Sequence, residues 1–288
     1  MKYTQFLIFE ICRECNLGAV HTKCPNTDPA RFANVDTSRM LDDETIIETA
    51  VTMIRVHGFR GCIGWHYYNE PLLKAARILS LMQRIREREP SARFVLWTNG
   101  TKIPTDPAAL SRLSAFDRAW VTNYDGGDYK RIRTAIPQTT EVRWQLDARR
   151  DEQRGGNTAP CGRMFSEFVF DCFGNVHICC IDWRGECTVG NIHADPLPDL
   201  VERFQRIRAS VAAGIKGNAP QVCKKCQVKH ARISDLVPEI AAAARQAVKD
   251  ESLPYLRRGA ETLCVVGMGD VSATWKAHHA ARCEKLLR

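Results

Sequence analysis

The stretch TQFLIFEICRECNLGAVHTKC, residues 4–24, joins an apolar run to a group of three cysteines. Residues 4–11 contain the unbroken apolar run Phe6 to Phe9 and predict a strand. Cys12, Cys15 and Cys24 follow it within thirteen residues. A group of thiols at the end of a strand indicates either metal ligation or disulfides, and the rest of the chain decides between them.

Composition places the chain among globular proteins. With 288 residues and 44% hydrophobic content, it can bury one large core, or one core and a smaller unit. No window approaches 18 consecutive apolar residues, and no signal peptide is recognisable, so we expect a cytosolic protein without a membrane span. In a reducing compartment the thirteen cysteines are better explained by metal ligation than by disulfides.

The net charge of +8 identifies no partner. Basic residues are scattered along predicted helices, interleaved with acids in some of them, and form no tract with stacking aromatics. Nucleic-acid binding is therefore not expected, and attraction of an anionic substrate is the alternative.

Strand and helix patterns alternate over the first 150 residues or so. The predicted strands are 4–11, 62–69, 93–98, 118–123 and 141–147, and the predicted helices are 42–57, 71–88, 107–115 and 128–136. Such alternation implies right-handed βαβ units and a parallel sheet. The expected fold class is α/β: a partial (β/α) TIM-like barrel of about five to six parallel strands, too short for a complete eight-unit barrel.

Polar groups follow each of the first four predicted strands. They are the cysteine loop, Tyr68-Asn69-Glu70-Pro71, Thr98-Asn99-Gly100 and Asn123-Tyr124-Asp125-Gly126. Taken singly, each of the last three is also an ordinary turn or helix start. Because ligands bind at the carboxyl ends of parallel strands, the four groups together predict one active-site mouth.

Three thiolates at this mouth allow two metal sites. Structural zinc takes four ligands, which Cys12, Cys15, Cys24 and His21 provide. A four-iron cluster on three cysteines leaves one iron open to a ligand. The cluster explains why the thiols lie where a substrate binds.

These residues resemble the radical S-adenosylmethionine enzymes over most of residues 4–235. LIFEICRECNL resembles the family's first strand and LWTNGT its third strand end, while Asn69-Glu70-Pro71 resembles the Gly-Gly-Glu-Pro motif that holds the methionine amino group. The chain departs from the family at two places. The usual C-x3-C-x2-C spacing becomes C-x2-C-x8-C, for which we assign Cys12, Cys15 and Cys24, and Tyr68 and Asn69 replace the two glycines.

A second cysteine group follows. Residues 166–170 and 176–180 predict a β-hairpin around a turn at Phe173-Gly174-Asn175, and a helix at about 197–212 precedes Cys223-Lys-Lys-Cys226. This arrangement resembles the twitch-type auxiliary domain of the same family, a small β-hairpin plus helix unit. The resemblance implies a second four-iron cluster, and zinc is the alternative. The implied ligands are Cys161, Cys179, Cys223 and Cys226, with Cys180 as competitor for Cys179.

The resulting division has three parts. Residues 1–155 form the barrel, 156–235 the auxiliary domain and 236–288 a C-terminal helical extension. Within the extension, 236–251 predict an alanine-rich helix and 263–270 a strand and turn.

The resemblance implies cleavage of S-adenosylmethionine to a 5'-deoxyadenosyl radical, which abstracts a substrate hydrogen. Glu70 would accept the methionine amino group, beside Tyr68 and Asn69. Other implied cofactor or substrate contacts are Thr98, Asn99, Asn123 and Arg143. A fully ligated auxiliary cluster favours oxidation of the substrate, with an electron donor such as flavodoxin or ferredoxin as partner.

Rival chemistries remain open. Redox-neutral epimerisation needs a thiol hydrogen donor, for which Cys62, Cys180, Cys187 and Cys264 are candidates, with Cys172 and Cys283 as further spare thiols. Carbon–sulfur bond formation, peptide modification and a non-catalytic zinc or iron–sulfur protein that binds nucleic acid are further alternatives. A small polar substrate such as a sugar, aminocyclitol or nucleoside would suit a group of aromatic and acidic residues: Tyr67, Tyr68, Trp97, Trp144, Asp147 and Trp183.

Overall fold

An open eight-stranded sheet organises the protein. The computed structural model describes residues 4–18, 24–123, 129–143, 166–180, 182–212 and 220–225. The strands are β1 (Phe6–Phe9), β2 (Cys62–Gly64), β3 (Arg93–Thr98), β4 (Arg118–Asn123), β5 (Thr139–Arg143), β6 (Glu167–Phe170), β7 (Asn175–His177) and β8 (Thr188–Asn191). Their order in the sheet is β5-β4-β3-β2-β1-β6-β7-β8.

Strands β1 to β6 are parallel, and β7 and β8 extend the sheet antiparallel beyond β6. The predicted partial barrel is thereby confirmed, with six parallel strands in a sheet that does not close. Strand β6, which the sequence placed in the auxiliary hairpin, also pairs with β1 in register Phe6↔Glu167 to Phe9↔Phe170. The hairpin is therefore continuous with the barrel sheet.

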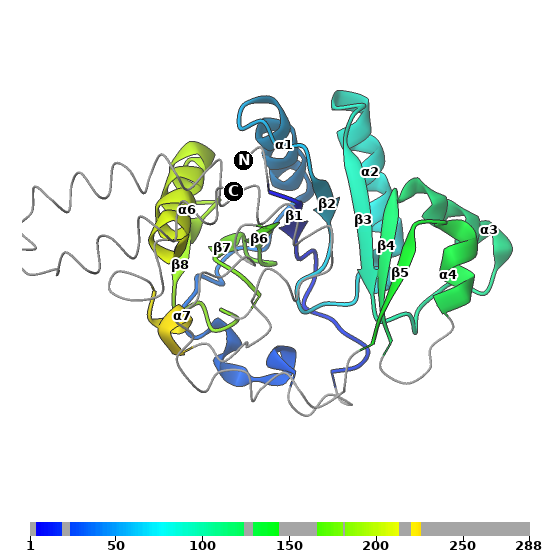
Figure 1. Ribbon diagram of the computed structural model, residues 1–288, viewed down its shortest axis with the longest axis horizontal. Coiled ribbons are helices and arrows are strands. Elements are labelled where there is room, and N and C mark those ends of the chain that lie inside the picture. The colour runs from blue at the N-terminus through cyan, green and yellow to red at the C-terminus, as the bar shows by residue number, and fades with distance from the viewer. Residues whose placement is uncertain are drawn as a thin grey trace, which may run out of the picture.

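Helices cover the outer face of the sheet (Figure 1). The α-helices are α1 (Asp43–Arg55), α2 (Ala75–Arg88), α3 (Pro107–Ser111), α4 (Tyr129–Ala135), α6 (Leu197–Ala212) and α7 (Gln221–Lys225). Short 3-10 helices are η1 (Pro25–Thr27), η2 (Pro29–Phe32), η3 (Pro71–Lys74) and η4 (Arg112–Ala115). None of the helices within these described ranges is long and apolar enough to cross a membrane.

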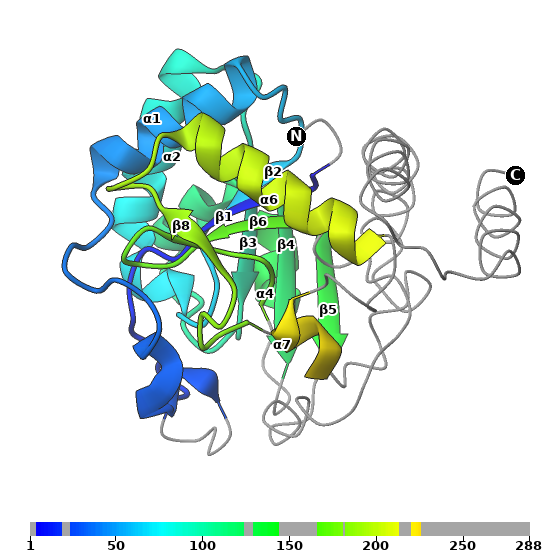
Figure 2. The ribbon, with the colours of Figure 1, turned by 90° about the vertical axis from the view of Figure 1, so that its left-hand side faces the viewer.

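Strand alternation divides the buried apolar residues between two faces. Leu7 and Phe9 of β1 join the main core with residues of α1, α2 and α6, whereas Phe6 and Ile8 face a second cluster with Trp120. Figure 2 shows α6 running along the molecule beside β8, and the ring of its Phe204 lies 4.6 Å from that of Phe168 in β6. The face of the sheet that these helices leave open is the inner face of the partial barrel.

Local sequence explains the helix that follows the cysteine loop. The Asp42 carboxylate caps α1 by accepting a hydrogen bond from the Thr45 amide at 2.8 Å, and Asp43 and Glu44 place negative charge in the first turn. The apolar stripe at helical spacing, from Ile46 to Ile54, is buried against the sheet as the sequence predicts.

Several strands have other ends than predicted, as β5 does, which begins at Thr139 rather than at residue 141. Strand β2 ends at Gly64 rather than at residue 69, because the Asn69 side chain accepts from the Tyr67 amide at 3.0 Å and donates to the Trp65 carbonyl at 3.0 Å. These side-chain hydrogen bonds take the place of the backbone hydrogen bonds that would continue β2 in the sheet. Strand β8 was not predicted; it is short and includes Gly190 at φ +146°.

Close backbone approach at Gly61 gives a first testable prediction. A Cβ at this position would lie 2.1 Å from the Gln5 carbonyl oxygen, which accepts the Cys62 amide and starts the β1–β2 ladder. Gly61→Ala is therefore expected to cost about 3 kcal/mol or more of unfolding free energy. Gly58→Asn is the control: Gly58 has φ +64° in open space, which Asn tolerates at a cost of about 1 kcal/mol. Thermal unfolding compares them, and equal losses would contradict the clash.

Several predictions concern residues outside the described ranges. Among them are the C-terminal extension 236–288, with its helix at 236–251 and strand at 263–270, and the residues His21, Trp144, Asp147, Cys161, Cys226, Cys264 and Cys283. The boundaries at 155/156 and 235/236 stay predictions.

Candidate active site

Glu70 is the central acid at the carboxyl ends of β2 and β3. Its carboxylate accepts from the Thr98 hydroxyl at 2.6 Å, the Leu72 amide at 3.0 Å and the Asn99 amide at 2.8 Å. Burial raises the pKa of Glu70, and the three hydrogen bonds oppose that rise. A carboxylate has about four lone-pair sites, so one acceptor position remains for a ligand.

The cysteine loop joins the same network. The Glu70 amide donates to the Glu14 carbonyl at 3.0 Å, and the Asn99 side chain donates to Asn16 Oδ1 at 3.2 Å. Asn16 in turn donates to the Thr101 hydroxyl at 2.7 Å. Three of the four predicted strand-end groups thus meet at one edge of the sheet.

The fourth group is described only by its backbone. Asn123 ends β4 and pairs in register with Arg143, which ends β5. Both residues therefore lie at the carboxyl ends of neighbouring parallel strands. Their side chains and residues 124–126 are outside the described part of the structure.

Cys12 is the most enclosed thiol of the loop. Its Sγ accepts from Asn69 Nδ2 at 3.6 Å and donates to the Glu14 carbonyl at 3.9 Å. Burial, together with the nearby Glu14 carboxylate, raises the pKa of Cys12 to about 11 in the absence of a metal. Cys24 is also buried, at the start of η1, whereas Cys15 is half-buried.

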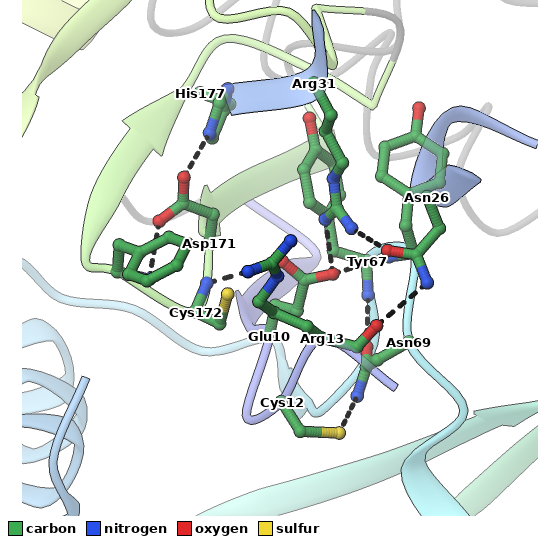
Figure 3. Close-up of polar contacts among 12 residues, drawn as sticks. Glu10, Cys12, Arg13, Asn26, Arg31, Tyr67, Asn69, Asp171, Cys172 and His177 are labelled. Atoms are coloured by element: carbon green, nitrogen blue, oxygen red, sulfur yellow. Dashed lines mark hydrogen bonds and ion pairs between the residues drawn. The ribbon is translucent and has the colours of Figure 1, made fainter. Parts of the chain in front are cut away.

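A buried ion pair anchors this loop, and Figure 3 shows it. Glu10 Oε1 lies 2.5 Å from Arg31 Nη2, and both side chains are 1% exposed or less. Glu10 also accepts from the Tyr68 amide at 3.1 Å and the Cys172 amide at 3.3 Å. One carboxylate therefore ties together the ends of β1, β2 and β6.

Arg31 extends the same network into the loop. Its Nη1 donates to Asn26 Oδ1, and the Asn26 amide donates to the Arg13 carbonyl at 2.8 Å. The guanidinium lies 4.9 Å from the Tyr68 ring centroid. Sequence reasoning missed Glu10, Arg31 and Asn26; the available signal was an acid directly after the apolar run of β1.

A second buried pair organises the hairpin beyond β6. His177 Nε2 lies 2.9 Å from Asp171 Oδ2 (Figure 3). His177 Nδ1 contacts the Asp182 carbonyl at 3.1 Å. Burial opposes both charges, yet each partner stabilises the other, so the pKa of Asp171 is lowered and that of His177 is raised. Asp171 also accepts the Asn175 amide at 2.9 Å, which fixes the turn.

Asp182 shapes the loop that carries Cys187. Its carboxylate accepts from the Glu186 amide at 2.9 Å and the Cys187 amide at 3.1 Å. Burial raises the pKa of Asp182 to about 6, and burial with the adjacent Asp182 raises that of Cys187 to about 12. Neither Asp171, His177 nor Asp182 was predicted as a site residue.

Two tyrosines connect the two cysteine regions. The Tyr67 hydroxyl donates to the Cys179 carbonyl at 3.3 Å, and the Tyr68 hydroxyl donates to the Cys180 carbonyl. Both tyrosines belong to the loop after β2 that also carries Asn69 and Glu70. The predicted first and second cluster regions are therefore joined by one short segment.

The candidate hydrogen donors occupy different places. Cys62 begins β2, at the opposite end of the strand from Glu70. Cys180 and Cys187 are half-buried in the hairpin region, and Cys172 is buried, which raises its pKa. Cys264 lies outside the described residues.

The arrangement of the thiols bears on which metal group they could ligate. None of the cysteines in the described ranges forms a disulfide, and within those ranges no three His, Cys, Asp or Glu side chains are grouped so that they could hold a metal ion. Zinc holds its sulfurs about 2.3 Å from one centre, so such a site is not formed by Cys12, Cys15 and Cys24 as they lie. A four-iron cluster held by three cysteines takes one thiolate on each of three irons, and Cys12, Cys15 and Cys24 are a donor set of that kind.

Comparisons with known proteins bear on the second region and on the fold. Residues 161–227 match the SPASM model, an iron–sulfur cluster-binding domain. This match spans all the predicted auxiliary ligands, which are Cys161, Cys179, Cys223 and Cys226, and the competitor Cys180. No curated protein sequence matches the chain.

Two of the solved structures that resemble this fold are structures of BtrN. One is SeMet BtrN in an open conformation, with 22% identity and a TM-score of 0.56, covering 79% of this chain and 94% of that one. The other is BtrN in complex with AdoMet and 2-DOIA, with 19% identity and a TM-score of 0.59, covering 82% and 97%. The chain thus shares the fold of the BtrN structures and carries a match to the SPASM iron–sulfur cluster-binding domain over residues 161–227.

Proposed function

We propose that this protein is a radical S-adenosylmethionine enzyme that oxidises a small polar substrate. The observation that carries the proposal is the hydrogen-bonded meeting of the cysteine loop with Glu70, Thr98 and Asn99 at the carboxyl ends of parallel strands. BtrN supports the proposal, because that protein has a similar fold and was solved in complex with AdoMet and 2-DOIA.

Cys12, Cys15 and Cys24 would hold the catalytic four-iron cluster, and Glu70 would accept the methionine ammonium at its remaining lone-pair site. The cluster, when bound, supplies the electron that cleaves the sulfonium to a 5'-deoxyadenosyl radical. The chain's own residues position and shield the reactants: Thr98 and Asn99 fix the Glu70 carboxylate.

The inner face of the barrel offers a surface for the substrate. The half-buried rings of His66 and Trp97 have centroids 5.0 Å apart, and Trp97 packs on the buried ring of Trp120 with centroids 5.3 Å apart. Trp97 Nε1 donates to the Thr122 hydroxyl at 2.8 Å. Flat aromatic faces with a few polar groups suit a sugar, aminocyclitol or nucleoside.

Oxidation is preferred to epimerisation because a cluster-binding domain is present to receive an electron. Cys161, Cys179, Cys223 and Cys226 would ligate that cluster fully, which leaves no iron open for substrate. We further propose a small electron-transfer protein, such as flavodoxin or ferredoxin, as the reductant of the catalytic cluster.

Iron analysis tests this assignment. Anaerobically reconstituted protein is expected to hold about eight irons, and a Cys12, Cys15 and Cys24 triple Ala variant about four, as each four-iron cluster contributes equally. AdoMet should perturb the EPR signal of the wild type alone. The matched control is Cys62→Ala, since Cys62 lies at the far end of β2 and should keep all the iron.

The same measurement resolves the auxiliary ligand. Cys179→Ala is expected to lower the iron content by about half and Cys180→Ala to leave it unchanged. Stoichiometric zinc with little iron, or an unchanged iron content in the triple variant, would contradict the proposed function.

A further inference from the structure

We propose that Asn69 is a positioning residue that tunes the reduction potential of the catalytic cluster by hydrogen-bonding to Cys12. The inference rests on the proposed function, because it requires a cluster on Cys12. It concerns the position where the resembled motif has glycine and this chain has a side chain that can donate.

The Asn69 amide is held rigidly. Its Oδ1 accepts from the Tyr67 amide at 3.0 Å, and its Nδ2 donates to the Trp65 carbonyl at 3.0 Å and to Cys12 Sγ at 3.6 Å. Both amide protons therefore have acceptors, as Figure 3 shows in part. Since the Trp65 and Tyr67 contacts fix the plane of the amide, its second N–H is directed at the sulfur without a further loss of side-chain freedom.

Burial increases the effect of this contact. Asn69 is 8% exposed and Cys12 is 4% exposed. A hydrogen bond in such a low-dielectric environment is electrostatically stronger than one in water. Once Cys12 is a thiolate, its own donation to the Glu14 carbonyl ends, whereas the donation from Asn69 remains.

A donor at a ligating sulfur favours the reduced cluster. Reduction adds negative charge that is shared with the thiolates, and hydrogen bonds to the sulfurs are among the factors that set the potential of an iron–sulfur cluster. Without the Asn69 donor the cluster should be harder to reduce. Asn69 would thus adjust how readily the external electron donor loads the site.

The test is an EPR-monitored redox titration of the reconstituted full chain, using the signal that AdoMet perturbs. Asn69→Gly removes the donor, and Asn69→Asp replaces it with an acceptor of nearly the same shape. The wild type is expected to have the highest midpoint potential, Asn69→Gly a lower one and Asn69→Asp the lowest. At a fixed potential, the ratio of reduced to oxidised cluster should fall about tenfold in Asn69→Gly, which corresponds to 59 mV for a one-electron couple.

This order separates tuning from a structural role. Asp keeps the acceptor for the Tyr67 amide and Gly does not, so a structural role alone would place Asp closer to the wild type than Gly. Asn26→Ala is the control, because Asn26 holds the same loop through the Arg13 carbonyl. This variant should change the ratio of reduced to oxidised cluster at a fixed potential by less than about twofold. The auxiliary cluster signal serves as an internal reference.

Several outcomes would overturn the inference. Two concern the catalytic cluster alone: unchanged midpoint potentials, or a lower potential in Asn69→Gly than in Asn69→Asp. A third is an equal shift of the auxiliary cluster signal. The fourth is loss of the catalytic cluster in both Asn69 variants while Asn26→Ala retains it. Failure of the proposed function is distinguishable, since the Cys12, Cys15 and Cys24 variant would then lose no iron.

Discussion

Replacing Glu10 with Ala is expected to lower the unfolding temperature of the protein by about 10 °C. The change leaves Arg31 buried and without its 2.5 Å partner, and breaking a buried ion pair on one side costs about 3–5 kcal/mol. It also removes the acceptor of the Tyr68 and Cys172 amides. In domains of about 150–250 residues the unfolding temperature falls by roughly 2–4 °C for each kcal/mol of unfolding free energy that is lost, which gives the expected shift.

The control for this prediction is an exposed pair of the same chemistry. Arg206 and Glu202 form an ion pair on α6, with side chains 67% and 59% exposed, so Arg206→Ala should change the unfolding free energy by less than about 1 kcal/mol. The double variant Glu10→Gln/Arg31→Met should be more stable than either single variant, because it leaves no unpaired charge. Scanning calorimetry on the reconstituted protein compares them. A Glu10→Ala variant as stable as Arg206→Ala would refute the anchoring role.

Glu70→Gln is expected to weaken AdoMet binding by about 10- to 100-fold. The substitution removes the negative charge proposed to accept the methionine ammonium, and a hydrogen bond to a charged group contributes about 1.5–3 kcal/mol. The glutamine NH2 group also replaces one carboxylate oxygen and cannot accept a hydrogen bond, so one of the three donors, from Thr98, Leu72 or Asn99, loses its acceptor. Isothermal titration of AdoMet into the reconstituted protein measures the affinity.

Thr98→Val separates the charge from its support. Valine has a similar shape but cannot donate to the Glu70 carboxylate, whose 2.6 Å bond to Thr98 is then lost while the charge remains. Affinity should fall by less than about tenfold, with an iron content equal to that of the wild type. Equal losses in Thr98→Val and Glu70→Gln would show that geometry rather than charge governs binding.

Local periodicity predicted most of the sheet and the location of the mouth. Apolar runs such as Phe6 to Phe9 and the helical stripe of α1 are properties of neighbouring residues, so they are visible in the sequence alone. The rule that parallel strands gather their carboxyl ends then placed Glu70, Thr98 and Asn99 together, as their hydrogen bonds confirm.

Contacts that join distant parts of the chain were not predictable in this way. Arg31 reaches Glu10 across 21 residues, and the Tyr68 hydroxyl reaches the Cys180 carbonyl across 112. No periodic pattern records such pairs. The early end of β2 has a similar cause, because the Asn69 side chain competes with the ladder for backbone groups.

The pairing of β6 with β1, together with the two tyrosine hydroxyls on Cys179 and Cys180, bears on whether the auxiliary region is a detachable module. Removing the chain from β6 onward would expose the backbone edge of β1 and uncover the Phe9 ring, whose centroid lies 5.2 Å from that of Phe170. A protein engineer who grafted this region onto another barrel would have to transfer an edge strand and the loop after β2 with it. For this chain, the natural unit of recombination is therefore the complete sheet.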